Sequence, residues 1–197
     1  IGVIHRGFST YQKTKYRNIP NWQIALDFKN QFPNIPMIID PSHICGNRIG
    51  LADITQEALN LGYQGAMIET HCTPDLAWSD ASQQITPEVL ANIIRNLKVR
   101  NTNIFGYEEQ LEQHRMLISD IDSQLIDLLA NRMKVAQKIG VLKKENNLTI
   151  FQPDRWKTIT DYATLKANEI GLSQDFVEKV FKAIHEESVE VQNKIMK

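Results

Sequence analysis

The chain has 197 residues, of which 42% are apolar and 23% are charged, and its formal net charge at pH 7 is −1. This composition is typical of a folded protein of one or two domains and excludes a disordered chain, and the scattered basic residues exclude a nucleic-acid partner. No apolar run approaches the roughly 20 residues that span a bilayer, and no signal-like segment opens the chain, so we expect a cytoplasmic protein with no membrane partner. The two cysteines, Cys45 and Cys72, form no C-x-x-C pair, which fits a reducing compartment.

The first hundred residues alternate short apolar runs with amphipathic stretches. The apolar runs predict buried strands at 1–5, 36–40 and 65–70, and the amphipathic stretches predict helices at 21–32, 51–62 and 86–97. Such strands separated by helices indicate an α/β fold with a parallel sheet buried on both faces. A polar loop follows each strand, and in a (β/α)8 barrel these loops build the active site. Because the first strand begins at Ile1, we expect the chain to begin inside a domain.

Three residues in these loops form a candidate metal set: His43 in "DPSH", Glu69 in "IETH" and Asp80 in "WSDASQQ". One imidazole and two carboxylates suit a divalent ion such as Mn²⁺ better than a structural zinc site, which would be rich in cysteine. The alternative is that they are ordinary hydrogen-bonding or surface residues of the loops.

Residues 101–107, "NTNIFGY", break both patterns and are the predicted linker. From residue 108 onwards nothing reads as a strand, so the second half is predicted to be all-α with three helices. The first ends near Asn146, the second begins with Pro153 in its first turn and stops at Gly171, and Ser173 caps the third.

The first of these helices carries an apolar seam with spacings of three and four, in which Arg132 stands where the pattern predicts a leucine. At about 1.5 Å per residue the helix measures on the order of 50 Å, which is longer than a 90-residue globule. We therefore predict an intertwined dimer in which two such helices pair. The seam consists of Ile118, Ile121, Leu125, Leu128, Val135, Ile139 and Leu142.

A guanidinium in this seam is costly unless an anion meets it. Lys143 lies eleven positions after Arg132, about 20° away on the same face of the helix. Arg115 lies roughly 25 Å from Arg132 along the helix, so only the Arg115 of an antiparallel second copy could lie near Arg132 and Lys143. Ser188 and Gln192, four positions apart, interrupt the apolar stripe of the third helix. These residues predict a site for a ligand with at least two negative groups. The alternative is that Arg132 only sets the helix register and that the polar pair faces water.

The segments "RMLISDIDSQLIDLLANRMKVAQKIGVLK", "PDR" and "EESVEVQ" resemble the all-helical chorismate mutases, and this resemblance covers residues 108–197. It implies that Arg115 of the partner subunit and Arg132 hold the carboxylates of chorismate, that Lys143 and Gln192 donate to the ether oxygen, and that Arg155 and Ser188 complete the lining. The rearrangement to prephenate needs no cofactor, only a compact conformer and stabilised negative charge. The sequence departs from the family pattern at Gln152 and Trp156, where acidic residues commonly handle the substrate hydroxyl.

The segments "IHRGFSTYQKTKYRN", "MIIDPSHICGNR" and "MIETHCTPDLAWSDASQQITPE" resemble the 3-deoxy-7-phosphoheptulonate synthases, which condense phosphoenolpyruvate with erythrose 4-phosphate. The resemblance implies that residues 1–100 are the last three βα units of the barrel. It also implies that His43, Glu69 and Asp80 bind the metal together with a cysteine of an early strand, and that Arg6 grips the phosphate of phosphoenolpyruvate. Neither cysteine of this chain aligns with that early cysteine.

Together these features predict a chorismate mutase domain at 108–197 fused to the C-terminal part of a metal-dependent synthase at 1–100, in aromatic amino acid biosynthesis. The alternative is a helical module that binds chorismate or prephenate without converting it, mediates dimerisation and regulates the synthase.

Overall fold

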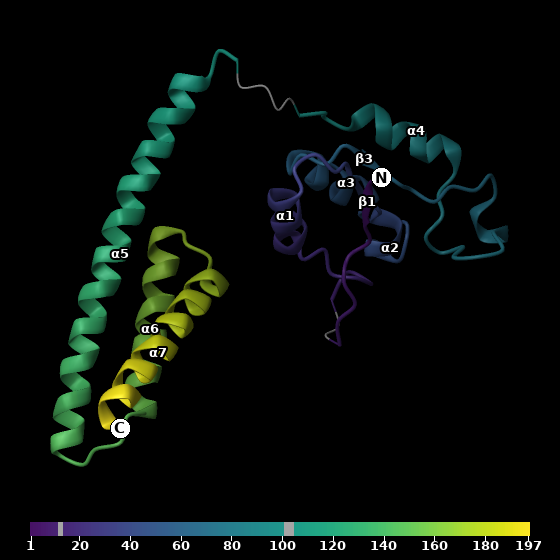
Figure 1. Cartoon of the computed structure of the whole chain (residues 1–197). Coiled ribbons are helices and arrows are strands. Elements are labelled where there is room, and N and C mark those ends of the chain that lie inside the picture. The colour runs from purple at the N-terminus through teal and green to yellow at the C-terminus, as the bar shows by residue number, and fades with distance from the viewer. Residues whose placement is uncertain (12–13, 101–104) are drawn as a thin grey trace. The chain divides into compact units, whose positions relative to one another are not determined.

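The computed structural model describes residues 1–11, 14–100 and 105–197, which divide into two compact units, Ile1–Phe105 and Gly106–Lys197 (Figure 1). Residues 101–104 of the predicted linker lie outside the described residues. No helix in the described part of the chain is both long enough and apolar enough to cross a membrane.

The first unit is built on a parallel sheet of three short strands in the order β1-β2-β3. The strands are β1 Val3–His5, β2 Met37–Ile39 and β3 Gly65–Ala66. The prediction of three parallel strands is confirmed, but β3 is much shorter than the predicted run at 65–70. Because β3 is the edge of the described sheet and pairs only with β2, the ladder ends after Ala66, and Thr70 forms an isolated bridge with Ile85.

One face of this sheet carries the core of the unit. Met37 and Ile39 of β2 are buried and pack with residues of α1 Trp22–Gln31 and α3 Leu51–Asn60. On the opposite face, Ile4 is 48% exposed. The prediction that the strands are buried on both faces is therefore wrong for this sheet, because the described chain places no layer over that side of β1.

The loops after the strands contain more regular structure than predicted. The segment after β2 forms the short helix α2 Pro41–Cys45, and the segment after β3 contains the 3-10 turn η1 Pro74–Leu76, followed later by α4 Pro87–Asn96. Asp40 begins α2, because its side chain accepts a hydrogen bond from the backbone N–H of His43 and Pro41 occupies the first turn. This capping places His43 directly beyond the end of β2.

The second unit consists of three helices, as predicted: α5 Glu108–Glu145, α6 Pro153–Ile170 and α7 Gln174–Met196. Pro153 lies in the first turn of α6, Gly171 ends it with a φ of 76°, and the Ser173 side chain caps α7 by accepting from the N–H of Phe176. The 38 residues of α5 measure about 57 Å at 1.5 Å per residue. The hairpin of α6 and α7 lies along the C-terminal half of α5, and the N-terminal half extends beyond it (Figure 1).

Helices α5 and α7 approach closely at Gly140. A Cβ atom at this position would lie 3.1 Å from Ile195 Cδ1, 3.2 Å from Gln192 Cγ and 3.3 Å from Gln192 Cα. The small side chain of Ala136, one turn earlier on α5, is also buried. These two residues let the two helix backbones come together, and this contact fixes where Gln192 lies.

Candidate functional site

A cavity of about 400 Å³ lies between the three helices of the second unit. Apolar and polar side chains of α5, α6 and α7 line it together. The lining residues are Arg132, Val135, Ala136, Ile139, Lys143, Ile150, Gln152, Arg155, Trp156, Ile159, His185, Ser188, Val189 and Gln192.

Arg132 enters this cavity from α5 and is held by α7. Its Nη1 donates to Ser188 Oγ and, at 3.4 Å, to the carbonyl of Ile184, while Ser188 Oγ donates to the same carbonyl at 2.7 Å. Burial lowers the pKa of the Arg132 guanidinium from its ordinary value, and the positive charge of Arg155 lowers it further. No carboxylate among the described residues forms an ion pair with Arg132, so the two cations share a pocket that an anion would stabilise.

Lys143 and Gln192 also line the cavity and are buried, each with only 8% of its surface exposed. Lys143 Nζ donates to the carbonyl of Ile150 at 2.5 Å, which leaves two of its three protons for another acceptor. Gln192 Nε2 donates to the carbonyl of Ser188 at 3.2 Å, and its Oε1 is buried without a hydrogen-bond partner in the described part of the chain. Buried polar atoms normally have partners, so this oxygen indicates a ligand or water in the cavity.

The start of α6 supplies Gln152, Arg155 and Trp156. The Trp156 ring lies against the His185 ring of α7, with centroids 4.2 Å apart and planes inclined by 31°. Sequence reasoning did not select His185. The signal was present, because His185 lies three positions before Ser188 and therefore on the same face of α7.

Arg115 does not reach this cavity in a single chain. Its side chain is 61% exposed and lies 3.7 Å from Glu112 on the same turn of α5. The structure thus brings together all the predicted mutase residues except Arg115, namely Arg132, Lys143, Gln152, Arg155, Trp156, Ser188 and Gln192.

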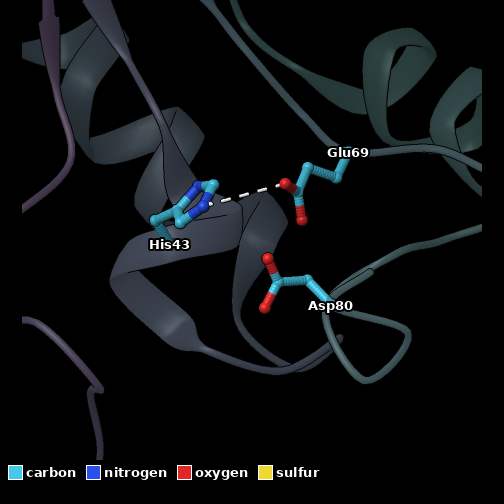
Figure 2. Close-up of side chains that lie close together, drawn as sticks. All are labelled: His43, Glu69 and Asp80. Atoms are coloured by element: carbon cyan, nitrogen blue, oxygen red, sulfur yellow. Dashed lines mark ion pairs between the residues drawn. The ribbon is translucent and has the colours of Figure 1, made fainter. Parts of the chain in front are cut away.

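The predicted metal residues of the first unit also come together. Ligand atoms of His43, Glu69 and Asp80 lie within 4.8 Å of one another, and both carboxylates face the imidazole ring (Figure 2). His43 Nε2 is 3.7 Å from Glu69 Oε1, and Glu69 Oε2 is buried with no hydrogen-bond partner among the residues described. A nitrogen ligand, two carboxylates and an unpartnered buried oxygen fit a divalent cation.

Asp40 supports this cluster from behind and was not selected from the sequence. It is fully buried, and its Oδ2 lies 2.7 Å from His43 Nδ1, which directs His43 Nε2 towards Glu69. Arg6 Nε is 3.4 Å from the same carboxylate oxygen, so Arg6 lies beside the cluster. The signal was the aspartate that ends the second strand three positions before His43, where its side chain can reach the following turn.

Comparison with known families assigns both units. The model of the DAHP synthetase I family matches residues 1–104, which is more than half of the chain. The chain belongs to the DAHP synthetase I family. The model of chorismate mutase type II matches residues 114–193, within the helical unit. Both are families of enzymes, and together they indicate aromatic amino acid biosynthesis. The resemblance of each half of the sequence to its family is thereby confirmed.

Individual relatives cover one unit each. The DAHP synthetase half is 26% identical over 96 residues to a phospho-2-dehydro-3-deoxyheptonate aldolase of Thermotoga maritima, covering 49% of this chain and 28% of that protein. The helical half is 32% identical over 80 residues to a bifunctional chorismate mutase/prephenate dehydratase of Buchnera aphidicola, covering 41% of this chain and 21% of that protein.

A solved structure of a truncated 3-deoxy-D-arabino-heptulosonate 7-phosphate synthase from Thermotoga maritima is 26% identical, with a TM-score of 0.44. The match covers 48% of this chain and 35% of that structure. The chain spans about a quarter of the length of these curated relatives.

Proposed function

We propose that the helical unit catalyses the rearrangement of chorismate to prephenate. The observation that supports this most directly is the cavity itself, in which the buried side chains of Lys143 and Gln192 share one lining with the Arg132 and Arg155 cations. Arg132, together with Arg115 of a second copy, would hold the two carboxylates of chorismate in the compact conformer, and Arg155 would complete the lining. Lys143 and the amide of Gln192 would donate to the ether oxygen, where negative charge develops in the transition state.

We propose further that a second copy of this chain completes the site. Three apolar residues of the seam, Ile118, Ile121 and Leu125, are 50% to 57% exposed on the half of α5 that the hairpin leaves uncovered, and Leu128, just beyond its midpoint, is 65% exposed. An exposed apolar stripe of this length on a 38-residue helix favours pairing with an identical helix. In an antiparallel pair, Arg115 of one copy would approach the cavity of the other.

A mixing experiment tests the shared site. Arg115→Ala and Arg132→Ala variants of the 197-residue chain are each expected to be almost inactive in the loss of chorismate absorbance. If the two arginines act from different chains, unfolding and refolding the variants together gives hybrid dimers with one intact site. Activity should then recover to about a quarter of the wild-type value for random pairing. No recovery, with dimers confirmed by light scattering, would place both arginines in one chain's site and overturn the proposal.

Lys143 tests the chemistry separately. Lys143→Met keeps most of the side-chain volume and removes the donor, and losing one such donor costs roughly 3 to 4 kcal/mol, so kcat should fall by several hundredfold. Lys144→Met is the matched control, because Lys144 is exposed and donates to the Ile195 carbonyl outside the cavity. The proposal fails if Lys143→Met, folded as judged by circular dichroism, converts chorismate at the rate of the control.

The second candidate is a sensor that binds chorismate or prephenate, dimerises and regulates the synthase without converting the ligand. The observation that favours it is the α6 start, where Gln152 and Trp156 offer no carboxylate to the cavity. Calorimetric binding of chorismate with no prephenate formed after correction for the spontaneous rate would select this function over the mutase.

For the first unit, we propose that His43, Glu69 and Asp80 hold a divalent ion such as Mn²⁺ of a 3-deoxy-7-phosphoheptulonate synthase site, with Arg6 binding the phosphate of phosphoenolpyruvate. The family is generally metal-dependent. A bound ion would polarise an oxygen of the substrate. Titration with Mn²⁺ followed by electron paramagnetic resonance is expected to show one bound ion per chain, lost in His43→Ala, and equal binding by the variant would refute this assignment.

A further inference from the structure

The wall of the helical cavity contains one polar side chain to which neither family resemblance gives a role. His185 lines the cavity from α7, one turn before Ser188. Its ring contacts two aromatic rings, with Trp156 at a centroid distance of 4.2 Å and Phe151 at 6.0 Å. Within the described residues, neither ring nitrogen has a hydrogen-bond partner. The imidazole is therefore fixed in position while its polar atoms stay available.

The cavity is rich in donors and poor in acceptors. Arg132, Arg155 and Lys143 only donate, and the Trp156 indole also only donates. The hydroxyl of Ser188 is already engaged, because it accepts from Arg132 and donates to the Ile184 carbonyl. These groups suit carboxylates and an ether oxygen. They can donate to the oxygen of a ligand hydroxyl, but none of them can accept a hydrogen bond from its O–H.

Three acceptors remain among the lining side chains: the Oε1 of Gln192, the amide of Gln152 and the imidazole of His185. Gln192 is buried next to the close helix contact at Gly140, on the side of the cavity already assigned to the ether oxygen. Gln152 is exposed at the start of α6, and its side chain makes no cap hydrogen bond. His185 alone is both held by neighbouring rings and open to the cavity.

We propose that His185 determines specificity by accepting a hydrogen bond from the ring hydroxyl of the hydroxylated dicarboxylate, while Trp156 holds the imidazole in place. This inference rests on the proposal that the cavity binds chorismate, and it assigns recognition of the hydroxyl to α7 instead of α6.

The charge on the ring agrees with this role. The charged groups that act on His185 are Arg132 on α5 and Glu186 on α7 itself, and Arg155 of α6 lines the same cavity. Burial lowers the pKa of His185 from its ordinary value, and the positive charge of Arg132 lowers it further, which outweighs the opposing effect of Glu186. Near neutral pH the imidazole is uncharged, and a neutral imidazole has one nitrogen that accepts.

The test combines a variant with a modified substrate. The 197-residue chain and its His185→Phe variant, which keeps an aromatic ring against Trp156, are assayed with chorismate and with an analogue in which hydrogen replaces the ring hydroxyl. Each kcat/KM is divided by the spontaneous rate of the same compound. Because one neutral hydrogen bond is lost, the wild type should prefer chorismate by about five- to tenfold. The variant should have lost that preference, so the ratio of its two corrected values should be about one.

A merely structural role for His185 predicts a different result, with both substrates slowed equally by His185→Phe and the preference kept. That result would overturn the inference. A wild-type chain that converts neither compound would overturn the mutase proposal instead. The same comparison made with calorimetric dissociation constants would then decide whether His185 reads the hydroxyl, since the preference should still disappear in the variant.

Discussion

Whether Gly140→Ala stabilises or destabilises the protein depends on one contact between helices α5 and α7. In an exposed helix interior, replacing glycine with alanine stabilises by about 0.5 to 1 kcal/mol, because the unfolded chain loses freedom. At Gly140 the new Cβ would lie 3.3 Å from the Cα of Gln192 and 3.1 Å from Ile195 Cδ1. The isoleucine can turn away, but the Cα belongs to the backbone of α7, so the helix must move by several tenths of an ångström.

Overpacking of this kind costs about 1 to 3 kcal/mol, which exceeds the gain in helix propensity. We expect the free energy of unfolding of Gly140→Ala to fall by about 1 kcal/mol. Because the displaced backbone carries Gln192, the separation between this side chain and Lys143 should also change, and kcat/KM for chorismate should fall by about tenfold.

Urea unfolding followed by circular dichroism at 222 nm measures the stability effect, and chorismate absorbance measures the activity. The matched control is the pair Lys138→Gly and Lys138→Ala at an exposed position of the same helix, which gives the propensity gain without a packing cost. The prediction is refuted if Gly140→Ala raises the urea midpoint by as much as the midpoints of the two Lys138 variants differ. In that case a Cβ atom at Gly140 has no packing cost against α7.

Three further predictions follow from single contacts. Arg132→Leu should raise the melting temperature by a few degrees, because a half-buried cation near Arg155 is removed, while chorismate conversion falls by about a hundredfold; a lower melting temperature would contradict this. Asp40→Asn should weaken Mn²⁺ binding in a paramagnetic resonance titration by about 10- to 100-fold, and unchanged affinity would show that Asp40 does not orient His43. Burial raises the pKa of Tyr63 to about 12. The neutral phenol therefore makes its full contribution to the free energy of unfolding below about pH 10, and this contribution falls by on the order of 2 kcal/mol as the pH rises towards 12. Urea unfolding at pH 8.5 and 11.5 should show this extra loss in the wild type and not in Tyr63→Phe.

The elements with strong local signals were predictable from the sequence. Pro153, Gly171 and Ser173 mark helix ends through their own backbone or side-chain chemistry, and the structure places the ends of α6 and α7 at these residues. The long helix α5 was equally evident, because its apolar spacing continues for many turns. Strand β3 was predicted four residues too long, since apolar residues continue beyond the point where a pairing partner is present.

The site was less predictable than the fold. Charged residues within an apolar seam stand out, which is why Arg132 and Lys143 could be selected. Residues that act by supporting others carry no such contrast. Asp40 resembles an ordinary helix cap, and His185 resembles one more residue on a half-buried helix face. Their roles depend on contacts with His43 and Trp156 that appear only when separate elements pack together.

The unbroken course of α5 makes the spacing along it a fixed property of the protein. One residue inserted between Arg115 and Arg132 would rotate the first side chain by about 100° relative to the second and shift it by about 1.5 Å. A seven-residue insertion would nearly restore the rotation but lengthen the rod by about 10 Å. We therefore expect this segment to tolerate substitutions but not insertions or deletions. The turns on either side of the helix are free of this constraint.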